Sequence, residues 1–251
     1  MLGFVAGMGG VGTTTASENC GIALAQRGRR VVFVDASGAM RSPAPDRLPT
    51  LVDHIEGRVE LAATLRGTDG ALRRVVAGNL AALALATDPQ RWGEVGAALD
   101  ALRDLADVVI LDTGSAQSPI ANKLVAHSDH AVVITDGTAA AVADAYGAIK
   151  ALAQGSFEHP LHLLVTRVAS RDEAELVWHR LRGGTLRFLS RELNWLGLLP
   201  EDHQVRTATA RAEPFYEAFP ATVASEYLDR VVAALERYLP RPAGAACKLE
   251  A

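Results

Sequence analysis

The fold is decided by the stretch Gly7-Met8-Gly9-Gly10-Val11-Gly12-Thr13-Thr14-Thr15, close to the start of the chain. An apolar run from Leu2 to Ala6 precedes it, and helical periodicity follows from about Thr14 to Gln26. Between a strand and a helix, glycines let backbone N–H groups wrap a polyphosphate, and the helix N-terminus attracts the same anion. The stretch therefore has the layout of a phosphate-binding P-loop, but Thr13 occupies the position of the usual lysine.

Short apolar runs alternate with helical stretches along the rest of the chain. The runs are continuously apolar, as strands buried on both faces are. Repeated strand–helix units predict an α/β fold with a doubly wound, mostly parallel sheet flanked by helices. The expected strands are Leu2–Ala6, Val31–Asp35, Leu80–Ala86, Val108–Asp112, Ala131–Thr135, Leu161–Thr166 and Trp195–Leu199. The expected helices are Thr14–Gln26, Arg91–Leu105, Ser118–Ala126, Ala139–Ala153, Arg171–Phe188 and Thr222–Leu239.

The bulk composition is that of an ordinary globular protein. Its 251 residues, 49% of them hydrophobic, predict one domain over residues 1–239 and a mobile tail over residues 240–251. A net charge of −4 and a pI near 6.0 argue against strong nucleic-acid binding. The cysteines, Cys20 and Cys247, form no ligand cluster and are expected to be reduced thiols of a cytoplasmic protein. No apolar run reaches the roughly 18 residues of a spanning helix, so membrane contact is expected to be peripheral at most.

Candidate functional residues gather at the carboxyl ends of the expected strands, where ligands of doubly wound sheets bind. These segments are the loop after Ala6, the loop after Asp35, and Asp112-Thr113-Gly114. The last segment is either a residual Mg²⁺ site or a polar turn that caps the helix near Ser118. The seven histidines are scattered and form no convincing set of metal ligands.

Several segments together resemble the MinD/ParA class of P-loop ATPases, which carries the deviant Walker A loop K-G-G-x-G-K-[ST]. In the first part of the chain the likeness lies in Gly9 to Gly12, Asn19, Ala23 to Gly28 and Val31 to Asp35. Farther along, Asp144 to Lys150 resembles the helix D-A-Y-x-x-I-K, Val165 to Val168 the strand end V-N-R-V, and Leu196 to Asp202 the segment G-x-I-P-x-D.

One later segment narrows the resemblance within that class. Residues Arg211 to Pro220 are similar to Q-x-P-[FV]-x-E-x-[FY]-P of FlhG, also called FleN or YlxH, a MinD-like regulator of flagellar number and placement. The likeness extends from about residue 2 to residue 239. It implies ATP or ADP with Mg²⁺ as cofactor and a cytoplasmic location at the cell pole or flagellar base. The implied partners are C-ring switch proteins, an FlhF-type GTPase or a flagellar transcription activator.

The resemblance also assigns the candidate site, residue by residue. Thr14, Asp35 and Asp112 fall at the Mg²⁺ positions. The nucleotide-binding positions are Gly9, Gly10, Val11, Gly12, Thr13, Thr14, Thr15, Asp35, Asp112, Thr166 and Arg167.

Four departures from the family pattern affect this site. The signature lysine, which reaches the phosphates of the dimer partner, falls at Met8, and the Walker lysine falls at Thr13. The second aspartate of switch I, which positions the attacking water, falls at Ser37, and the adenine-reading asparagine falls at Thr166. We therefore assign no catalytic residue.

The lost charges predict a pseudo-ATPase with no nucleotide cofactor or a weakly bound one. A charge-assisted hydrogen bond to phosphate contributes about 1.5–3 kcal/mol. Losing two lysines would weaken ATP binding by about two to four orders of magnitude. We also expect no nucleotide-dependent dimer. The chain is then expected to work as a nucleotide-independent regulator that binds flagellar proteins.

Other interpretations remain open at this point. The glycine loop could be a tight turn without a ligand. An active ATPase could use another lysine, such as Lys123 or Lys150, and the chain could position a different cellular cargo, as ParA and MinD relatives do. The basic stretch from Arg167 to Arg191 contains interleaved acidic residues, so a solvated helix face competes with a partner-binding patch. The final helix, about Thr222 to Leu239, has too few basic residues on its polar face for a membrane helix and is expected to pack on the sheet.

Overall fold

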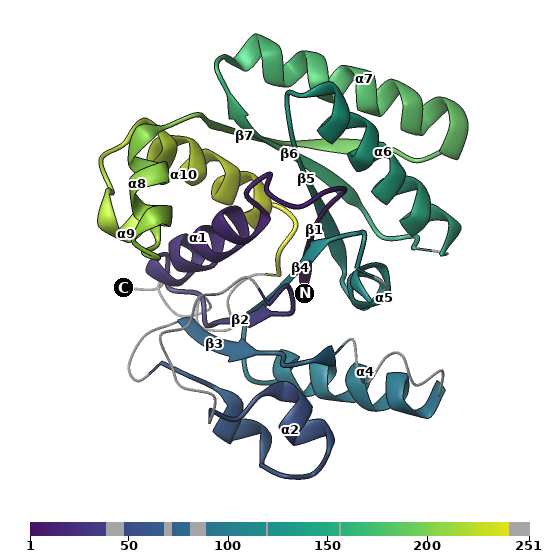
Figure 1. Ribbon diagram of the computed structural model, residues 1–251, viewed down its shortest axis with the longest axis vertical. Coiled ribbons are helices and arrows are strands. Elements are labelled where there is room, and N and C mark those ends of the chain that lie inside the picture. Colours follow the sequence, from purple (N-terminus) through teal and green to yellow (C-terminus); the bar gives the residue numbers. More distant parts are fainter. Residues whose placement is uncertain (39–47, 68–71, 81–88, 119, 156, 241–251) are drawn as a thin grey trace, which may run out of the picture.

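The computed structural model describes residues 1–38, 48–67, 72–80, 89–118, 120–155 and 157–240. In these residues seven strands form one parallel sheet with the order β3-β2-β4-β1-β5-β6-β7 (Figure 1). The predicted doubly wound parallel sheet is therefore confirmed. The strands are β1 (Leu2–Ala6), β2 (Val31–Asp35), β3 (Leu72–Val76), β4 (Val108–Ser115), β5 (His130–Asp136), β6 (Leu161–Val168) and β7 (Leu193–Pro200).

Helices cover both faces of the sheet, as Figure 1 shows. One face carries α1 (Thr13–Gln26), α8 (His203–Ala210), α9 (Phe215–Ala218) and α10 (Val223–Glu236). The other face carries α2 (Leu51–Ile55), the short 3₁₀ helix η1 (Leu61–Thr64), α4 (Pro89–Arg103), α5 (Ala121–Val125), α6 (Ala139–Gln154) and α7 (Arg171–Leu189).

The central strands are buried on both faces, which explains their continuously apolar sequence. In β1, Phe4 packs into the core below α1 while its neighbour Val5 packs into the core below α6. In β2, the side chains of Phe33 and Val34 likewise pack into cores on opposite faces of the sheet. Successive side chains of a strand point to opposite faces, so a strand between two helical layers needs apolar residues at every position.

The third strand was predicted in the wrong place. The structure forms β3 from Leu72–Val76, and Leu80, where the expected strand Leu80–Ala86 begins, is helical. Residues 81–86 of that prediction lie outside the described residues. The strand β3 lies at the edge of the sheet beside β2 and includes Arg73 and Arg74, so it lacks the continuously apolar pattern on which the prediction relied.

The last helix packs on the molecule, as predicted. Thr222 caps α10 by accepting a hydrogen bond from the backbone N–H of Ser225 at 3.2 Å. The apolar face of α10 packs against α1 and β7. Its buried residues are Leu228, Val231, Val232 and Leu235. Within the described residues, no helix is both long enough and apolar enough to cross a membrane.

Candidate functional site

The predicted P-loop leaves β1 at Ala6 and enters α1 at Thr13. Gly12 has a φ of 91°, a left-handed conformation that glycine adopts without steric cost. A Cβ atom at Gly9, Gly10 or Gly12 would meet no described atom within 4 Å, so one side of the loop is open. No side chain among the described residues caps α1, and the N–H groups of an uncapped first turn attract anions.

The opposite side of the loop is backed by α6. A Cβ atom at Gly7 would overlap the backbone of Asp144 and Ala145, so only glycine permits this approach. The D-A-Y-x-x-I-K resemblance falls on the same helix, and its first two residues are the ones that touch the loop. The glycine scaffold is thus held on one side and accessible on the other.

The positions of the two family lysines bring no charge to the loop. Met8 is partly buried against the core beneath α1, and Thr13 is buried. Of the two alternative lysines, Lys123 places its Nζ 4.7 Å from the ring centroid of Trp92, and Lys150 is exposed on α6. Neither lysine lines the cavity beside the loop.

Three predicted Mg²⁺ positions do converge. Asp35, the last residue of β2, pairs in register with Asp112 within β4, and both are buried. The Thr14 hydroxyl donates to Asp112 Oδ2 at 2.6 Å. Ser37 joins the two carboxylates, because its Oγ lies 2.7 Å from Asp35 Oδ1 and 3.2 Å from Asp112 Oδ2. The residue at the switch I position is therefore part of the cluster.

Burial gives this cluster an unusual electrostatic character. It raises the pKa of Asp112 from 3.8 to about 6, and the nearby Asp35 carboxylate acts in the same direction. Hydrogen bonds from Thr14, Ser37 and the backbone of Gly114 oppose the shift. Two carboxylates and a hydroxyl are oxygen ligands of the kind that Mg²⁺ takes together with a nucleotide phosphate. Among the described residues, no group of three or more histidines, cysteines or carboxylates could hold a metal without such help.

The segment Asp112-Thr113-Gly114 is the end of a strand and does not cap a helix. The Thr113 hydroxyl donates to the carbonyl of Phe4 at 2.9 Å, and the Gly114 N–H donates to Asp112 Oδ1 at 3.1 Å. The following helix, α5, begins at Ala121, later than the predicted Ser118, and has no side-chain cap among the described residues. The capping interpretation was therefore wrong.

The end of β6 binds the P-loop through the loop's own carbonyl oxygens. The Thr166 hydroxyl lies 2.6 Å from the Val11 carbonyl oxygen and 3.2 Å from that of Thr135. The Arg167 guanidinium donates to the Gly10 carbonyl, and Arg167 itself has a left-handed φ of 55°. Thr166 thus lies at the predicted place beside the loop, but its hydroxyl is engaged with the protein backbone.

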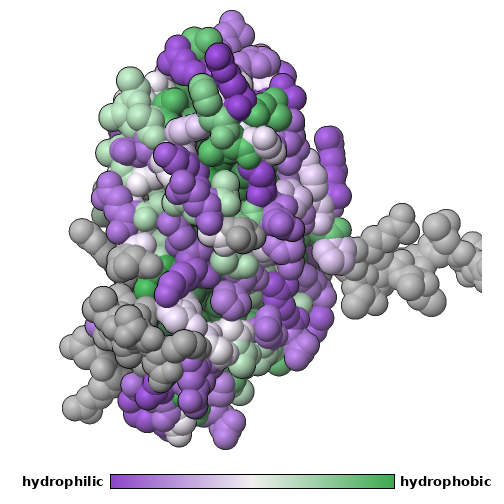
Figure 2. All heavy atoms as spheres, turned by 90° about the vertical axis from the view of Figure 1, so that its right-hand side faces the viewer, coloured by the Kyte–Doolittle hydropathy of each residue, from purple (hydrophilic) through white to green (hydrophobic). Residues whose placement is uncertain are grey.

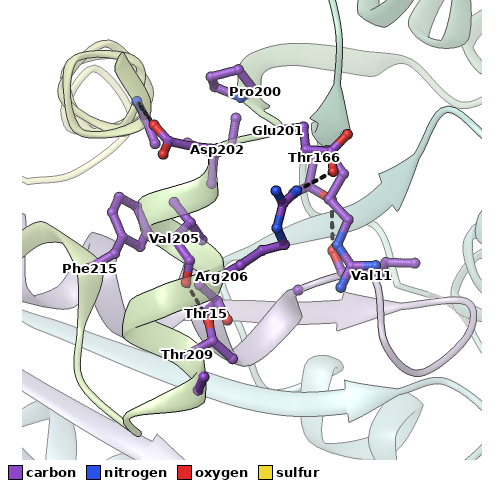
Figure 3. Close-up of a pocket in the computed structure, with 15 residues that line it drawn as sticks. Val11, Thr15, Thr166, Pro200, Glu201, Asp202, Val205, Arg206, Thr209 and Phe215 are labelled. Atoms are coloured by element: carbon purple, nitrogen blue, oxygen red, sulfur yellow. Dashed lines mark hydrogen bonds and ion pairs between the residues drawn. The ribbon is translucent and has the colours of Figure 1, made fainter. Parts of the chain in front are cut away.

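A cavity of about 540 Å³ adjoins the open side of the loop. Figure 3 shows it between α8 and the P-loop, with Val205 and Phe215 on one side and Val11 and Thr166 on the other. The lining is largely apolar, and Arg206 forms an ion pair with Glu201 at its edge (Figure 3). A planar, weakly polar group of a ligand would fit such walls.

Sequence reasoning missed the contribution of α8 to this cavity. Asp202 caps α8 by accepting a hydrogen bond from the Gln204 N–H at 2.7 Å. A capping aspartate that follows Pro200 at a strand end is a detectable signal for a helix start. The length of the helix, eight residues, was too short for periodicity to indicate it.

Beyond this site, the face of the molecule with α6 and α7 is mixed in polarity. Figure 2 shows a mostly hydrophilic surface with apolar side chains among the charged ones. On α7 the large exposed apolar residues are Leu176, Leu186 and Phe188. Its arginines pair in part with acids of the same region, for example Arg171 with Glu175 at 2.6 Å. This matches a solvated helix face more closely than a uniformly basic patch.

The comparison with protein families supports one class. Residues 2–215 match the CobQ/CobB/MinD/ParA nucleotide binding domain. This match and the geometry of the loop, the paired carboxylates and the sheet show that the chain belongs to this MinD/ParA family of P-loop proteins.

Individual relatives narrow the likeness. The antiactivator FleN of Pseudomonas aeruginosa is 30% identical over 250 residues, which cover 97% of this chain and 88% of FleN. The septum site-determining protein MinD of Bacillus subtilis is 30% identical over 225 residues, 83% of this chain and 78% of that protein. The resemblance to the FleN branch of the MinD class is therefore confirmed at the level of sequence similarity.

Solved structures confirm the fold. MinD of Pyrococcus horikoshii complexed with Mg-ADP superposes with a TM-score of 0.73 at 18% identity, covering 95% of this chain and 97% of that one. The MinC:MinD cell division complex of Aquifex aeolicus gives a TM-score of 0.73 at 21% identity, covering 94% of this chain and 95% of that one. At these identities the likeness concerns the fold alone.

Proposed function

We propose that this chain is a FleN-like regulator of flagellar number and placement that acts by binding proteins, with ATP binding and hydrolysis weakened or lost. The observation that carries the proposal is the replacement of every charged phosphate contact in an otherwise intact scaffold. Met8 and Thr13 stand at the lysine positions, and Ser37 stands at the position of the water-positioning aspartate. The similarity to FleN over 97% of the chain supports the flagellar part of the proposal.

The chemistry of the site supports weak binding and slow hydrolysis of a nucleoside triphosphate. Phosphoryl transfer depends on positioning and on neutralising the charge that develops on the phosphates. The buried carboxylates Asp35 and Asp112 lie beside the loop, and none of the described residues that line the adjoining cavity is a lysine. The Ser37 hydroxyl is held between these carboxylates and is far less basic than the aspartate it replaces. Bound Mg²⁺ would supply charge neutralisation, with Thr14, Asp35 and Asp112 as the residues that would hold it.

The proposed partners are those of flagellar assembly, at the cell pole or flagellar base. C-ring switch proteins, an FlhF-type GTPase and a flagellar transcription activator are the candidates, because the resemblance to flagellar regulators of the FlhG type implies them. FleN, the similar protein, is an antiactivator by name. Partner binding by a MinD-like fold has a precedent in the MinC:MinD complex. Peripheral membrane contact is not needed for this mode of action, since α10 buries its apolar face against α1 and β7.

An active MinD/ParA-type positioning ATPase, for flagella or another cargo, is the second candidate. It is favoured by the open glycine loop, the 540 Å³ cavity and a guanidinium beside the loop. Arg167 donates to the Gly10 carbonyl and lines the cavity, so its guanidinium lies beside the phosphate-binding positions that the resemblance assigns. In this reading Arg167 would take over part of the task of the missing lysines.

Calorimetric titration with Mg·ATP and Mg·ADP up to millimolar concentration tests the biochemical part of the proposal, with light scattering for the oligomeric state. We expect no binding below the millimolar range, no change of mass and no release of phosphate. A Met8→Lys/Thr13→Lys variant is the positive control, and it should gain at least tenfold in ATP affinity because charge-assisted bonds to phosphate contribute about 1.5–3 kcal/mol each. Micromolar binding with dimer formation by the unaltered chain would establish the second candidate.

A deletion strain tests the flagellar part. Changed flagellar number or placement, restored by a copy carrying Asp112→Asn, would support a nucleotide-independent flagellar role. Normal flagella with another cargo misplaced would contradict it.

A further inference from the structure

Two histidines, the fully buried His162 and the half-buried His130, form a pair at the end of the sheet opposite the P-loop. His130 begins β5 and His162 is the second residue of β6, so both lie at the amino ends of their strands. His130 Nδ1 and His162 Nε2 are 3.2 Å apart, and the ring centroids are 5.3 Å apart. His162 is fully buried, and its Nδ1 has no hydrogen-bond partner among the described residues.

This geometry accommodates one proton between the facing nitrogens. A hydrogen bond between two imidazoles requires one nitrogen to carry hydrogen and the other to accept it. A proton on each of the facing nitrogens would place two N–H donors 3.2 Å apart, and a proton on His162 Nδ1 would charge a buried ring at a nitrogen without an acceptor among the described residues. A buried charge without a partner is strongly unfavourable, so the His162 ring fits the fold only in its neutral form.

The segment Arg237–Pro240, which follows α10 and which we call the C-terminal strap, lies on this pair. The Tyr238 ring meets His162 edge to face with a centroid distance of 4.4 Å and lies 5.6 Å from the ring of His130. The Arg29 guanidinium donates to the Pro240 carbonyl at 2.5 Å. The three strap residues from Tyr238 onward also line a cavity of about 240 Å³, so the strap covers a space that it does not fill.

Charged groups from several elements surround the pair. The Asp129 carboxylate, already bonded to Arg103 at 2.7 Å, favours a charged His130, as does a hydrogen bond with the backbone of Tyr238. Burial is the largest influence and lowers the pKa of both histidines, that of His162 to about 4. The other groups that face the pair or its cavity are the amino group of Met1 before β1, Asp107 before β4 and His159 before β6.

We propose that the His130–His162 pair is an acid-sensitive clasp that holds the C-terminal strap while the buried His162 ring is neutral and releases it when that ring is protonated. Release breaks the hydrogen bond from Arg29 to Pro240 but little packing of Tyr238, because this residue is 39% exposed and the strap covers a cavity. Once the strap lifts, both rings reach water and can be charged. The end of α10 would then be free of the sheet, while the P-loop at the opposite end is untouched.

The expected size of the effect follows from proton linkage. Acid favours the open form because the rings bind protons more readily there. With a pKa of about 4 for His162 in the closed form and an ordinary value of 6.5 when open, the opening equilibrium should rise about tenfold between pH 7.5 and pH 5.5. The change should begin below pH 6.5 and continue down to about pH 4.

Amide hydrogen exchange by NMR tests the clasp on the full chain. The N–H of Tyr238 donates to the Leu235 carbonyl at 2.9 Å and that of Leu239 to the Glu236 carbonyl, so both amides report on the strap. We expect their protection factors to fall about tenfold from pH 7.5 to pH 5.5, while those of amides within β5 and β6 stay constant. Protection factors correct for the intrinsic pH dependence of exchange.

Variants separate the clasp from other causes. A His130→Phe/His162→Phe variant keeps the aromatic contacts and should lose the pH dependence, whereas the control His203→Gln, on exposed α8, should retain it. Tyr238→Ala changes an exposed side chain and should lower strap protection already at pH 7.5, without affecting β5 and β6.

Three results would overturn the proposal. They are equal strap protection at both pH values, an unchanged pH dependence in the double variant, and a loss of protection at pH 5.5 that extends equally through β5. Because none of these measurements involves nucleotide or flagella, the clasp and the proposed function can fail independently.

Discussion

Replacement of Asp112 by asparagine should change how the stability of the protein depends on pH. Asp112 is buried, and its pKa of about 6 in the folded chain exceeds the ordinary value of 3.8. The folded state therefore binds a proton at this residue more readily than the unfolded state does. The contribution of Asp112 to the stability of the folded state is least favourable above pH 6 and becomes more favourable as the pH falls from 6 toward 3.8.

The magnitude follows from the same two pKa values. Relative to pH 7.5, protonation of Asp112 should stabilise the folded state by about 0.8 kcal/mol at pH 5.5 and by about 2 kcal/mol at pH 4.5. His162 acts in the opposite direction, because its lowered pKa of about 4 makes acid destabilising below pH 6.5. In the unaltered protein the titrations of Asp112 and His162 therefore change the stability in opposite directions between pH 6.5 and pH 4. The difference between the protein and its Asp112→Asn variant removes the histidine contribution, which is common to both.

Urea unfolding at pH 7.5, 5.5 and 4.5 measures this difference. The stability of the unaltered chain relative to Asp112→Asn should increase with acid by the amounts given above. The matched control is Asp53→Asn, because hydrogen bonds from Thr50 lower the pKa of Asp53 to about 2. The stabilisation that Asp53 contributes is present above pH 3.8 and lost only as the pH falls toward 2. The difference in unfolding free energy between the unaltered chain and Asp53→Asn should therefore stay constant down to pH 4.5. A pH-independent difference for Asp112, or one that falls with acid, would refute the reasoning about the carboxylate pair.

Three further outcomes follow from other parts of the structure. Gly7→Ala should destabilise the chain by more than about 2 kcal/mol in urea unfolding, since the added Cβ would overlap the backbone of Asp144, and an unchanged midpoint would contradict this packing. Arg27→Ala, which removes ion pairs of 2.8 and 2.9 Å to two carboxylates of α10, should cost about 0.5–1 kcal/mol at low salt and less at 1 M salt; a salt-independent loss would point to packing instead. In a Cys247→Ser variant, the thiol of Cys20 should resist Ellman's reagent until the chain unfolds, because burial raises its pKa to about 12; rapid reaction of folded protein would show that α1 opens.

The sequence was sufficient to predict the elements that build the site. The strand Leu2–Ala6 and the strand Val31–Asp35 have the predicted bounds, and α1 begins one residue before the predicted Thr14. These predictions succeeded because continuous apolar runs and a glycine-rich turn are local signals. The prediction of the third strand failed for a physical reason. The strand β3 lies at the edge of the sheet and contains two arginines, so its sequence is not a continuous apolar run.

Contacts between distant segments could not be predicted. Thr166 lies beside the P-loop, but its hydrogen bond to the Val11 carbonyl, 155 residues away in sequence, depends on how the end of β6 is placed relative to the loop that follows β1. The same holds for His130 and His162, which seemed scattered in the sequence and face each other only through the register of β5 and β6. From the sequence, Ser37 was expected only to remove the second aspartate of switch I, yet its hydroxyl joins the carboxylates of Asp35 and Asp112.

The anchoring of the P-loop by β6 has a consequence for how such proteins evolve. The carbonyl groups of Gly10 and Val11 are bound by Arg167 and Thr166, so the loop takes its shape from the rest of the chain. A loop shaped in this way does not rely on a bound ligand for its conformation. Substitutions at positions such as Thr13 can then change the chemistry of the site while leaving the fold intact, and selection on partner binding alone would be enough to preserve the architecture.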